Sequence, residues 1–250
     1  MNFKPIFGFI AGAFLALNLN ASTIKKGELI VATEGTYSPY SFYDEKGELV
    51  GYDVDIAKAV AQKLNLKVEF LTAPWDAMLA AFDAGKADVV FNQVSINEDR
   101  KKKYDMSVPY TMPYPVIVVH KDNNDIKSFA DLKGKKSVHS ATSNWAAIAE
   151  KNGATVVVAD GFSKGVELII SKRADDTIND NVTFFDYIKQ RPNAPLKIAY
   201  TSNEPLPTAA LLKKGNTELL EAINKALDEL KAEGKISEIS MKYFGKDISK

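Results

Sequence analysis

Residues 87–100 read Ala87-Asp88-Val89-Val90-Phe91-Asn92-Gln93-Val94-Ser95-Ile96-Asn97-Glu98-Asp99-Arg100, a β-branched and aromatic run followed by a polar turn. The run predicts a buried strand that ends at Asn92 and Gln93, and Asn97 is a favourable N-cap for a helix after it. A strand that leads directly into a helix is the repeating unit of α/β proteins.

Arg100 falls in the first turn of this predicted helix, beside unpaired backbone N–H groups and the positive end of the helix dipole. A planar guanidinium can bind both oxygens of a carboxylate, and the Ser95 hydroxyl adds a donor. The alternative is an arginine that is simply solvated at the surface. The stretch therefore predicts a carboxylate-binding site, provided that other residues support it.

The first 21 residues have the pattern of a secretory signal peptide. Lys4 precedes a mostly apolar run over 5–17, and Ala21 is the expected residue before cleavage. A membrane anchor is the alternative, but the run is shorter than the roughly 20 apolar residues that cross a bilayer. The chain has no cysteine, which excludes disulfides and a lipid-modified N-terminal cysteine. We expect a periplasmic protein that is secreted and not lipid-anchored.

The composition is that of a globular protein with balanced charge. Hydrophobic residues make up 46% of the chain, and 32 basic residues balance 32 acidic ones. The longest basic run, Arg100–Lys103, has no aromatic residues between its charges, so we expect no nucleic-acid partner. Two histidines without cysteine leave little for a transition-metal site, so we expect no metal and no cofactor.

Strand and helix patterns alternate along the chain, which predicts an α/β architecture with mostly parallel sheets. Loops after such strands, as in Ala73-Pro74-Trp75-Asp76 before a helix over 77–84, are where α/β proteins bind ligands. Proline-rich extended segments near 113–117 and 205–209 enclose a region with its own strand–helix units. We expect one lobe from 26–115 with 208–250 and a second from 116–207; a single continuous domain is the alternative.

Several short stretches, in a characteristic order, resemble the periplasmic solute-binding proteins of polar amino-acid ABC transporters (family 3), and among them the cystine-binding group. They cover nearly the whole chain after the signal peptide and are Glu34–Tyr40, Gly51–Ala57, Pro74–Leu79, Asn92–Lys102, Tyr104–Ser107, Pro109–Tyr110 and Asp176–Asp180. The resemblance implies the type II fold, in which two crossing strands join two α/β lobes and the ligand lies in the cleft between them.

The resemblance also implies roles for individual residues. Arg100 and Ser95 would bind the ligand α-carboxylate from the first lobe, and Ser143 would do so from the second. Asp180, helped by the backbone carbonyl at Gln93, would bind the α-ammonium. The ligand side chain would lie between two aromatic walls, Tyr37 and Trp75. Polar contacts would come from Glu34 and Asn144, and Thr142 is the substitute for the Ser143 hydroxyl.

Simpler roles remain open for several of these residues. Trp75 is by default a packing residue, and Asp180 is a good N-cap for a helix beginning at 181. Asp175 and Asp176 are expected to face solvent. If His139 reaches the cleft, its titration would change ligand affinity near pH 6–7.

We expect a monomer that captures a polar L-amino acid, cystine first and cysteine next, and delivers it to the membrane permease of an ABC transporter. Each lobe alone leaves one face of the ligand wet, so contacts with both lobes favour closure. No catalytic group is required. The alternatives are a ligand-sensing domain and an enzyme on the same fold, such as a cyclohexadienyl or arogenate dehydratase, for which Glu34 is a candidate acid.

Overall fold

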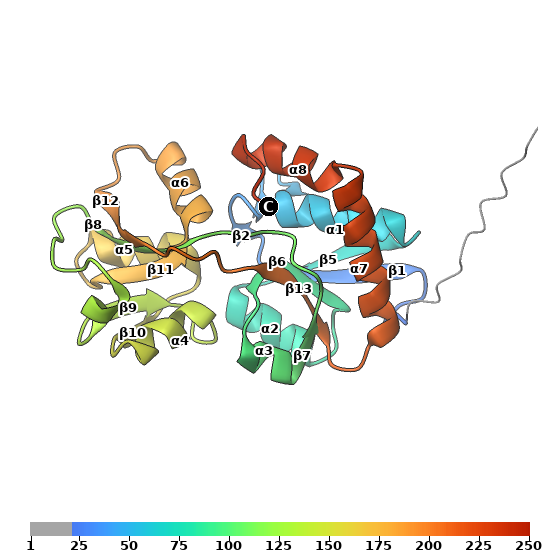
Figure 1. The fold of residues 1–250 in the computed structure, drawn as a ribbon, viewed down its shortest axis with the longest axis horizontal. Coiled ribbons are helices and arrows are strands. Elements are labelled where there is room, and N and C mark those ends of the chain that lie inside the picture. The colour runs from blue at the N-terminus through green and yellow to red at the C-terminus, as the bar shows by residue number, and fades with distance from the viewer. Residues whose placement is uncertain (1–21) are drawn as a thin grey trace, which may run out of the picture.

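The computed structural model describes residues 22–250, so the expected signal peptide at 1–21 lies outside the described residues. The chain forms two lobes that lie side by side, with two extended segments crossing between them (Figure 1). The predicted two-lobe α/β fold is thereby confirmed. Within residues 22–250, no helix has the length and apolar character needed to cross a bilayer.

The first lobe contains a five-stranded sheet in the order β5-β1-β6-β13-β7, and beside it a small antiparallel sheet of β2, β3 and β4. In the large sheet β1 is parallel to β5 and β6, whereas β13 is antiparallel to β6 and β7. Its elements are β1 Glu28–Thr33, β2 Thr36–Tyr37, β3 Ser41–Tyr43, β4 Leu49–Val50, α1 Tyr52–Lys63, β5 Lys67–Thr72, α2 Trp75–Asp83, β6 Val89–Ser95, α3 Glu98–Lys103, β7 Tyr104–Met106, β13 Thr208–Lys213, α7 Thr217–Ala232 and α8 Lys235–Phe244.

The second lobe contains a sheet in the order β10-β9-β11-β8-β12. Here β9 is parallel to β10 and β11, and β8 is antiparallel to β11 and β12. Its elements are β8 Pro115–His120, the 3₁₀ helix η1 Phe129–Leu132, β9 Lys136–His139, α4 Asn144–Lys151, β10 Thr155–Val158, α5 Gly161–Ile170, β11 Asp176–Asp180, α6 Asn181–Gln190 and β12 Leu196–Thr201.

Each large sheet is buried on both faces, and its apolar runs show why. In β8, Val116 and Val118 pack into one core with residues of α5 and α6, whereas Ile117 and Val119 pack into another with residues of η1 and α4. Successive side chains of a strand point to opposite faces, so a strand between two helix layers must be apolar throughout. In the same way, one face of the first sheet is covered by helices α1, α7 and α8, and the other face is covered by helix α2.

The two crossing segments pair with each other between the lobes, where Thr111 and Thr208 form an isolated antiparallel bridge. The strands before residue 107 and from 208 onward belong to the two sheets of the first lobe, and β8 to β12 form the sheet of the second. On this basis we propose lobe boundaries at 26–115 with 208–250, and at 116–207.

Two predicted boundaries are wrong. Strand β6 does not end at Asn92 and Gln93 but runs to Ser95, because β13, far away in sequence, pairs with its last residues. Helix α2 begins at Trp75 and not at Ala77, since Pro74 has the extended backbone suited to the position before a helix.

Candidate ligand-binding site

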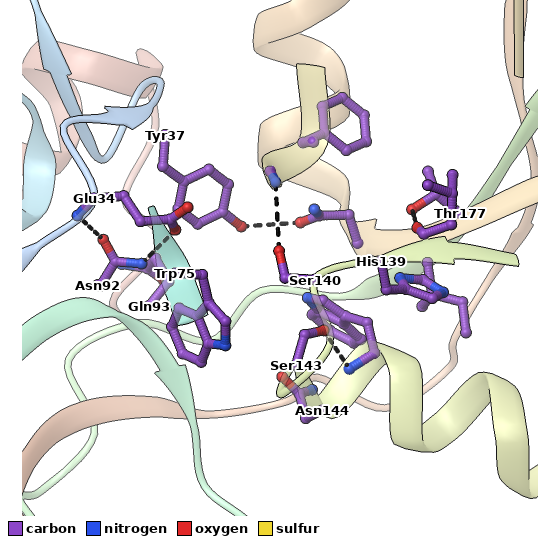
Figure 2. A pocket seen from close by; sticks show the side chains of 16 residues that line it. Glu34, Tyr37, Trp75, Asn92, Gln93, His139, Ser140, Ser143, Asn144 and Thr177 are labelled. Carbon is purple, nitrogen blue, oxygen red and sulfur yellow. Dashed lines mark hydrogen bonds between the residues drawn. The ribbon is translucent and has the colours of Figure 1, made fainter. Parts of the chain in front are cut away.

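The carboxyl ends of parallel strands from both lobes face one pocket between the lobes, the usual ligand position in open α/β sheets (Figure 2). Its empty volume is about 550 Å³ when the open solvent at its mouth is included. Six of the ten predicted site residues line it: Glu34, Tyr37, Trp75, Gln93, Ser143 and Asn144. The other four lie outside the lining: Ser95, Arg100, Thr142 and Asp180.

Three buried nitrogen donors, two on residues that line the pocket and one on Arg100 beside the lining residue Trp75, have no hydrogen-bond partner within residues 22–250. They are Nη2 of Arg100 and Nε1 of Trp75 in the first lobe, and Nδ2 of Asn144 in the second. Leaving a buried donor unsatisfied costs about 1–3 kcal/mol. All three groups require an acceptor, so the site is chemically suited to an anionic oxygen group such as a carboxylate.

Arg100 lies behind the Trp75 ring, with its guanidinium carbon 5.3 Å from the ring centroid. Asn97 caps α3 as predicted, because its side chain accepts a 2.9 Å hydrogen bond from the Arg100 backbone N–H. Nη1 donates to the backbone carbonyl of Ser95 at 2.9 Å, which fixes the guanidinium plane. Burial lowers the pKa of Arg100 to about 10, so the group is still cationic at neutral pH.

Glu34 follows β1 directly and is the acidic side chain that lines the pocket from the first lobe. It forms a reciprocal pair with Asn92, whose Nδ2 donates to Oε2 of Glu34 at 2.7 Å and whose Oδ1 accepts from the Glu34 N–H at 2.8 Å (Figure 2). Burial raises the pKa of Glu34 to about 7, against the opposing effect of the Asn92 bond. The carboxyl group can therefore change charge near neutral pH.

Gln93 has a left-handed backbone with φ 49°, which is unusual for a residue other than glycine. Its side chain holds it there: Nε2 donates to Asp53 at 2.7 Å, and Oε1 accepts from the Thr111 and Thr208 hydroxyls at 2.7 and 3.1 Å. Both threonines belong to the crossing segments. A residue of the pocket is thus tied directly to the connection between the lobes.

The loop before α4 supplies the predicted second-lobe hydroxyls. The Ser143 oxygen caps α4 by accepting from the backbone N–H groups of Trp145 and Ala146. Thr142 instead turns to the first lobe, where its N–H and hydroxyl donate to Asp76 at 2.9 and 2.6 Å. The loop therefore joins the two lobes at the rim of the pocket.

Asp180 caps α6, as one of its two predicted roles requires, by accepting from the Thr183 N–H at 2.8 Å. Its carboxylate also lies 2.8 Å from the Tyr37 hydroxyl and 3.0 Å from the Tyr40 hydroxyl, both in the first lobe. These partners hold it outside the pocket lining. In this arrangement Asp180 joins the lobes, and its predicted contact with a ligand ammonium remains a prediction.

Several pocket residues were not among the predicted site residues: Asn92, Val138, His139, Ser140, Trp145, Gly161, Phe162, Thr177, Ile178 and Asn179. A signal for Asn92 does exist, since it is a polar residue inside an apolar strand and immediately precedes Gln93. The residues of β9 and β11 carry no comparable signal, because only the pairing of these strands brings them to the cleft.

Two expectations about titratable groups are wrong. Asp176 does not face solvent but is 0% exposed, because β11 is an inner strand of its sheet. His139 lines the pocket, yet burial lowers its pKa to about 3, so it does not titrate at pH 6–7.

The fold is that of a two-lobe binding protein, and its pocket lies between the lobes. The chain belongs to the bacterial extracellular solute-binding proteins, family 3, whose sequence model matches residues 29–246. It is 44% identical over 234 residues to the L-cystine-binding protein TcyA of Bacillus subtilis. This match covers 93% of this chain and 87% of the relative. The relatives are named as binding proteins, which agrees with the expectation of a protein that is not an enzyme.

Two solved structures of similar sequence identity bear on how the lobes are arranged. An ancestral arginine-binding protein bound to arginine is 43% identical and superimposes with a TM-score of 0.81, covering 88% of this chain and 99% of that one. The L-cystine solute receptor of Neisseria gonorrhoeae, in the unliganded open conformation, is 42% identical with a TM-score of 0.60, covering 93% and 98%. Together with the bonds between the lobes, this contrast indicates a closed arrangement.

Proposed function

We propose that this chain captures a polar L-amino acid outside the cytoplasm, cystine first and cysteine next, and delivers it to the permease of an ABC transporter. The observation that carries the proposal is the set of unpartnered donors on Arg100, Trp75 and Asn144. A carboxylate placed among them would satisfy donors of both lobes at once. Charge-assisted hydrogen bonds of about 1.5–3 kcal/mol each would then favour the closed form with ligand.

The choice of cystine is supported by relatives and by the pocket. The B. subtilis and Escherichia coli relatives named L-cystine-binding proteins are 44% and 35% identical to this chain. Cystine carries an ammonium and a carboxylate at each end, and the pocket offers an ionisable Glu34 as well as the donor set. Arginine is the second candidate, since the superimposed ancestral protein is bound to arginine and an ionised Glu34 suits a cationic side chain.

The periplasm as location, the monomeric state and the permease partner are part of the same proposal. They are supported by the extracellular family and by the relative from Haemophilus influenzae, named a probable amino-acid ABC transporter-binding protein.

Calorimetric titration tests the proposal. Signal-free protein is unfolded and refolded to remove carried-over ligand, then titrated with L-cystine, L-cysteine under reducing conditions, and L-arginine. We expect one-to-one binding of L-cystine that weakens up to about 100-fold in Arg100→Ala, since the charged hydrogen bond from Nη2, of about 1.5–3 kcal/mol, is lost. The control Arg173→Ala removes an exposed arginine of the second lobe and should bind normally. Tight binding of arginine alone would change the substrate, and no binding of any amino acid would refute the proposal.

A further inference from the structure

A buried chain of three polar side chains leads from the second sheet to the pocket. The Ser137 hydroxyl lies 2.5 Å from Oδ1 of Asp176 and 2.8 Å from Nε2 of His139. Alternate residues of β9 point to the same face, which places Ser137 beside His139, and the pairing of β9 with β11 sets Asp176 opposite Ser137. Ser137 and Asp176 are 0% exposed.

Each end of this chain has an atom without a protein partner. Oδ2 of Asp176 is buried and makes no hydrogen bond within the described residues. At the other end, Nδ1 of His139 makes no hydrogen bond to residues 22–250. This atom is not fully buried, and the imidazole ring lines the pocket (Figure 2). Nδ1 is therefore the ring nitrogen left for a ligand.

The Ser137 hydroxyl has one proton, so the chain has one arrangement when Asp176 is ionised and another when the proton of Asp176 is on Oδ1, the oxygen that contacts the serine. When Asp176 is ionised, the hydroxyl donates to its carboxylate, so Nε2 of His139 must carry a proton to bond the serine oxygen, and Nδ1 is a bare acceptor. When Asp176 is protonated, it donates to the serine oxygen, the hydroxyl donates to Nε2, and the imidazole proton is on Nδ1. The imidazole is neutral in both arrangements.

We propose that Asp176 and Ser137 position the tautomer of His139, and that His139 is thereby a specificity-determining residue for the side chain of the bound amino acid. With Asp176 ionised, Nδ1 accepts a hydrogen bond and favours side chains that end in an ammonium, guanidinium or amide N–H. With Asp176 protonated, Nδ1 donates and favours a carboxylate or carbonyl oxygen. This inference rests on the proposed binding of an amino acid in the pocket.

The charges around the chain place both arrangements near neutral pH. Burial raises the pKa of Asp176 to about 7; Asp175 also raises it, whereas the Ser137 bond and Lys135 lower it. On β8 the residue opposite Asp176 is the uncharged Val119. Burial lowers the pKa of His139 to about 3, which keeps the ring neutral. Across the pocket Glu34 has a pKa of about 7, as does Asp53 behind the pocket residue Gln93, so an experiment on pH must separate Asp176 from both carboxyl groups.

Nuclear magnetic resonance of the ligand-free protein reads the tautomer directly. The chain has two histidines, so His120→Gln leaves His139 as the single histidine, and two-bond ¹H–¹⁵N spectra of ¹⁵N-histidine-labelled protein distinguish its two neutral tautomers. We expect conversion from the Nδ1–H to the Nε2–H tautomer between about pH 5.5 and 8.5. Asp176→Asn should hold Nδ1–H throughout, because its amide donates to Ser137, while the control Asp175→Asn should keep the transition.

One tautomer at every pH, or an unchanged transition in Asp176→Asn, would overturn the inference. If Asp176→Asn fails to fold, Ser137→Ala replaces it, since removal of the bridging hydroxyl should also abolish the transition.

Calorimetry then tests the effect on specificity in a Glu34→Gln background, which removes the second carboxyl group. L-arginine carries only donors at its side-chain terminus, whereas L-cystine carries donors and acceptors. From pH 8 to pH 6 we expect the affinity for arginine to fall about fivefold relative to cystine, the effect of one hydrogen bond. Asp176→Asn should remove this change. If the ratio of the arginine and cystine affinities does not change with pH, the inference is contradicted. If neither amino acid binds, the proposed function is contradicted.

Discussion

The carboxylate of Asp76 in the first lobe lies 2.6 Å from the Thr142 hydroxyl in the second. It also accepts from the backbone N–H groups of Thr142 at 2.9 Å and Ala141 at 3.1 Å. Asp76 is at the start of α2, next to the pocket residue Trp75. The same helix that contributes an aromatic wall of the pocket therefore also fastens the lobes together, so closure and ligand contact are structurally linked.

Asp76→Ala should favour the open form by about 1–2 kcal/mol, because partly exposed hydrogen bonds to a carboxylate contribute this much in sum. Ligand affinity should fall about 5- to 30-fold, since binding must then also close the lobes. Small-angle X-ray scattering of the ligand-free protein should show a larger radius of gyration. The matched control is Asp83→Ala at the end of the same helix, whose bonds to Lys103 and Tyr104 stay inside the first lobe. Equal affinities of the two variants would contradict this role.

A second prediction concerns the carboxyl group of Asp53, which anchors Gln93. Oδ1 of Asp53 accepts from Nε2 of Gln93 at 2.7 Å and from the Tyr110 hydroxyl at 2.9 Å, while Oδ2 has no partner in the described chain. Burial raises the pKa of Asp53 to about 7. The folded state thus retains a proton that the unfolded state releases near pH 4, and stability must fall as pH rises from about 4 to 7, then level off.

The slope in this window is about 1.4 kcal/mol per pH unit for each such group. Glu34 and Asp176 share the window, so Asp53→Asn should reduce the slope by about one group's share and not abolish it. Urea unfolding at a series of pH values measures this slope. Asp55→Asn, on the same helix and bonded at the surface to Lys242 and Tyr243, is the control. An unchanged slope in Asp53→Asn would show that Asp53 is ionised in the folded protein.

The contrast between Asn97 and Asp176 shows what a single sequence can predict here. The cap by Asn97 depends on residues three positions apart, so the chain itself contains the necessary information. The environment of Asp176 depends on a contact with Ser137, 39 residues away, and on the register of two strands. The strand and helix patterns along a chain do not say which residues of two strands face each other. For the same reason the lobes were predictable, whereas the residues that fasten them across the cleft were not.

Glu34 should make ligand binding depend on pH according to the charge of the ligand. Its pKa of about 7 means that the carboxyl group is neutral below this pH and anionic above it. Binding of the cationic L-arginine should therefore strengthen as pH rises from 6 to 8, by up to about tenfold, because a charged hydrogen bond replaces a neutral one. Calorimetry at both pH values should show that Glu34→Gln loses this contribution and keeps only the roughly fivefold change assigned to Asp176. Glu45→Gln, in the exposed hairpin of the first lobe, should behave like the wild type.

Substitution of Tyr37 should separate the effect of lobe closure on ligand affinity from an effect on the stability of the fold. Its hydroxyl lies 2.9 Å from Oδ1 of Asn179 and 2.8 Å from Asp180, both in the second lobe, while its ring lines the pocket. Tyr37→Phe keeps the ring but removes these bonds between the lobes. We expect ligand affinity to fall about tenfold, for a cost of about 1–1.5 kcal/mol, with little change in the stability of either lobe.

The control for this variant is Tyr43→Phe, because the Tyr43 hydroxyl bonds Thr72 at 3.0 Å inside the first lobe. Calorimetry should separate the two variants, whereas urea unfolding should not, since neither hydroxyl lies in a lobe core. A large loss of stability in Tyr37→Phe would mean that the loss of one hydrogen bond to the Asp180 carboxylate disrupts the second lobe itself. Normal affinity would mean that the remaining bond from Tyr40 is sufficient to hold the lobes closed.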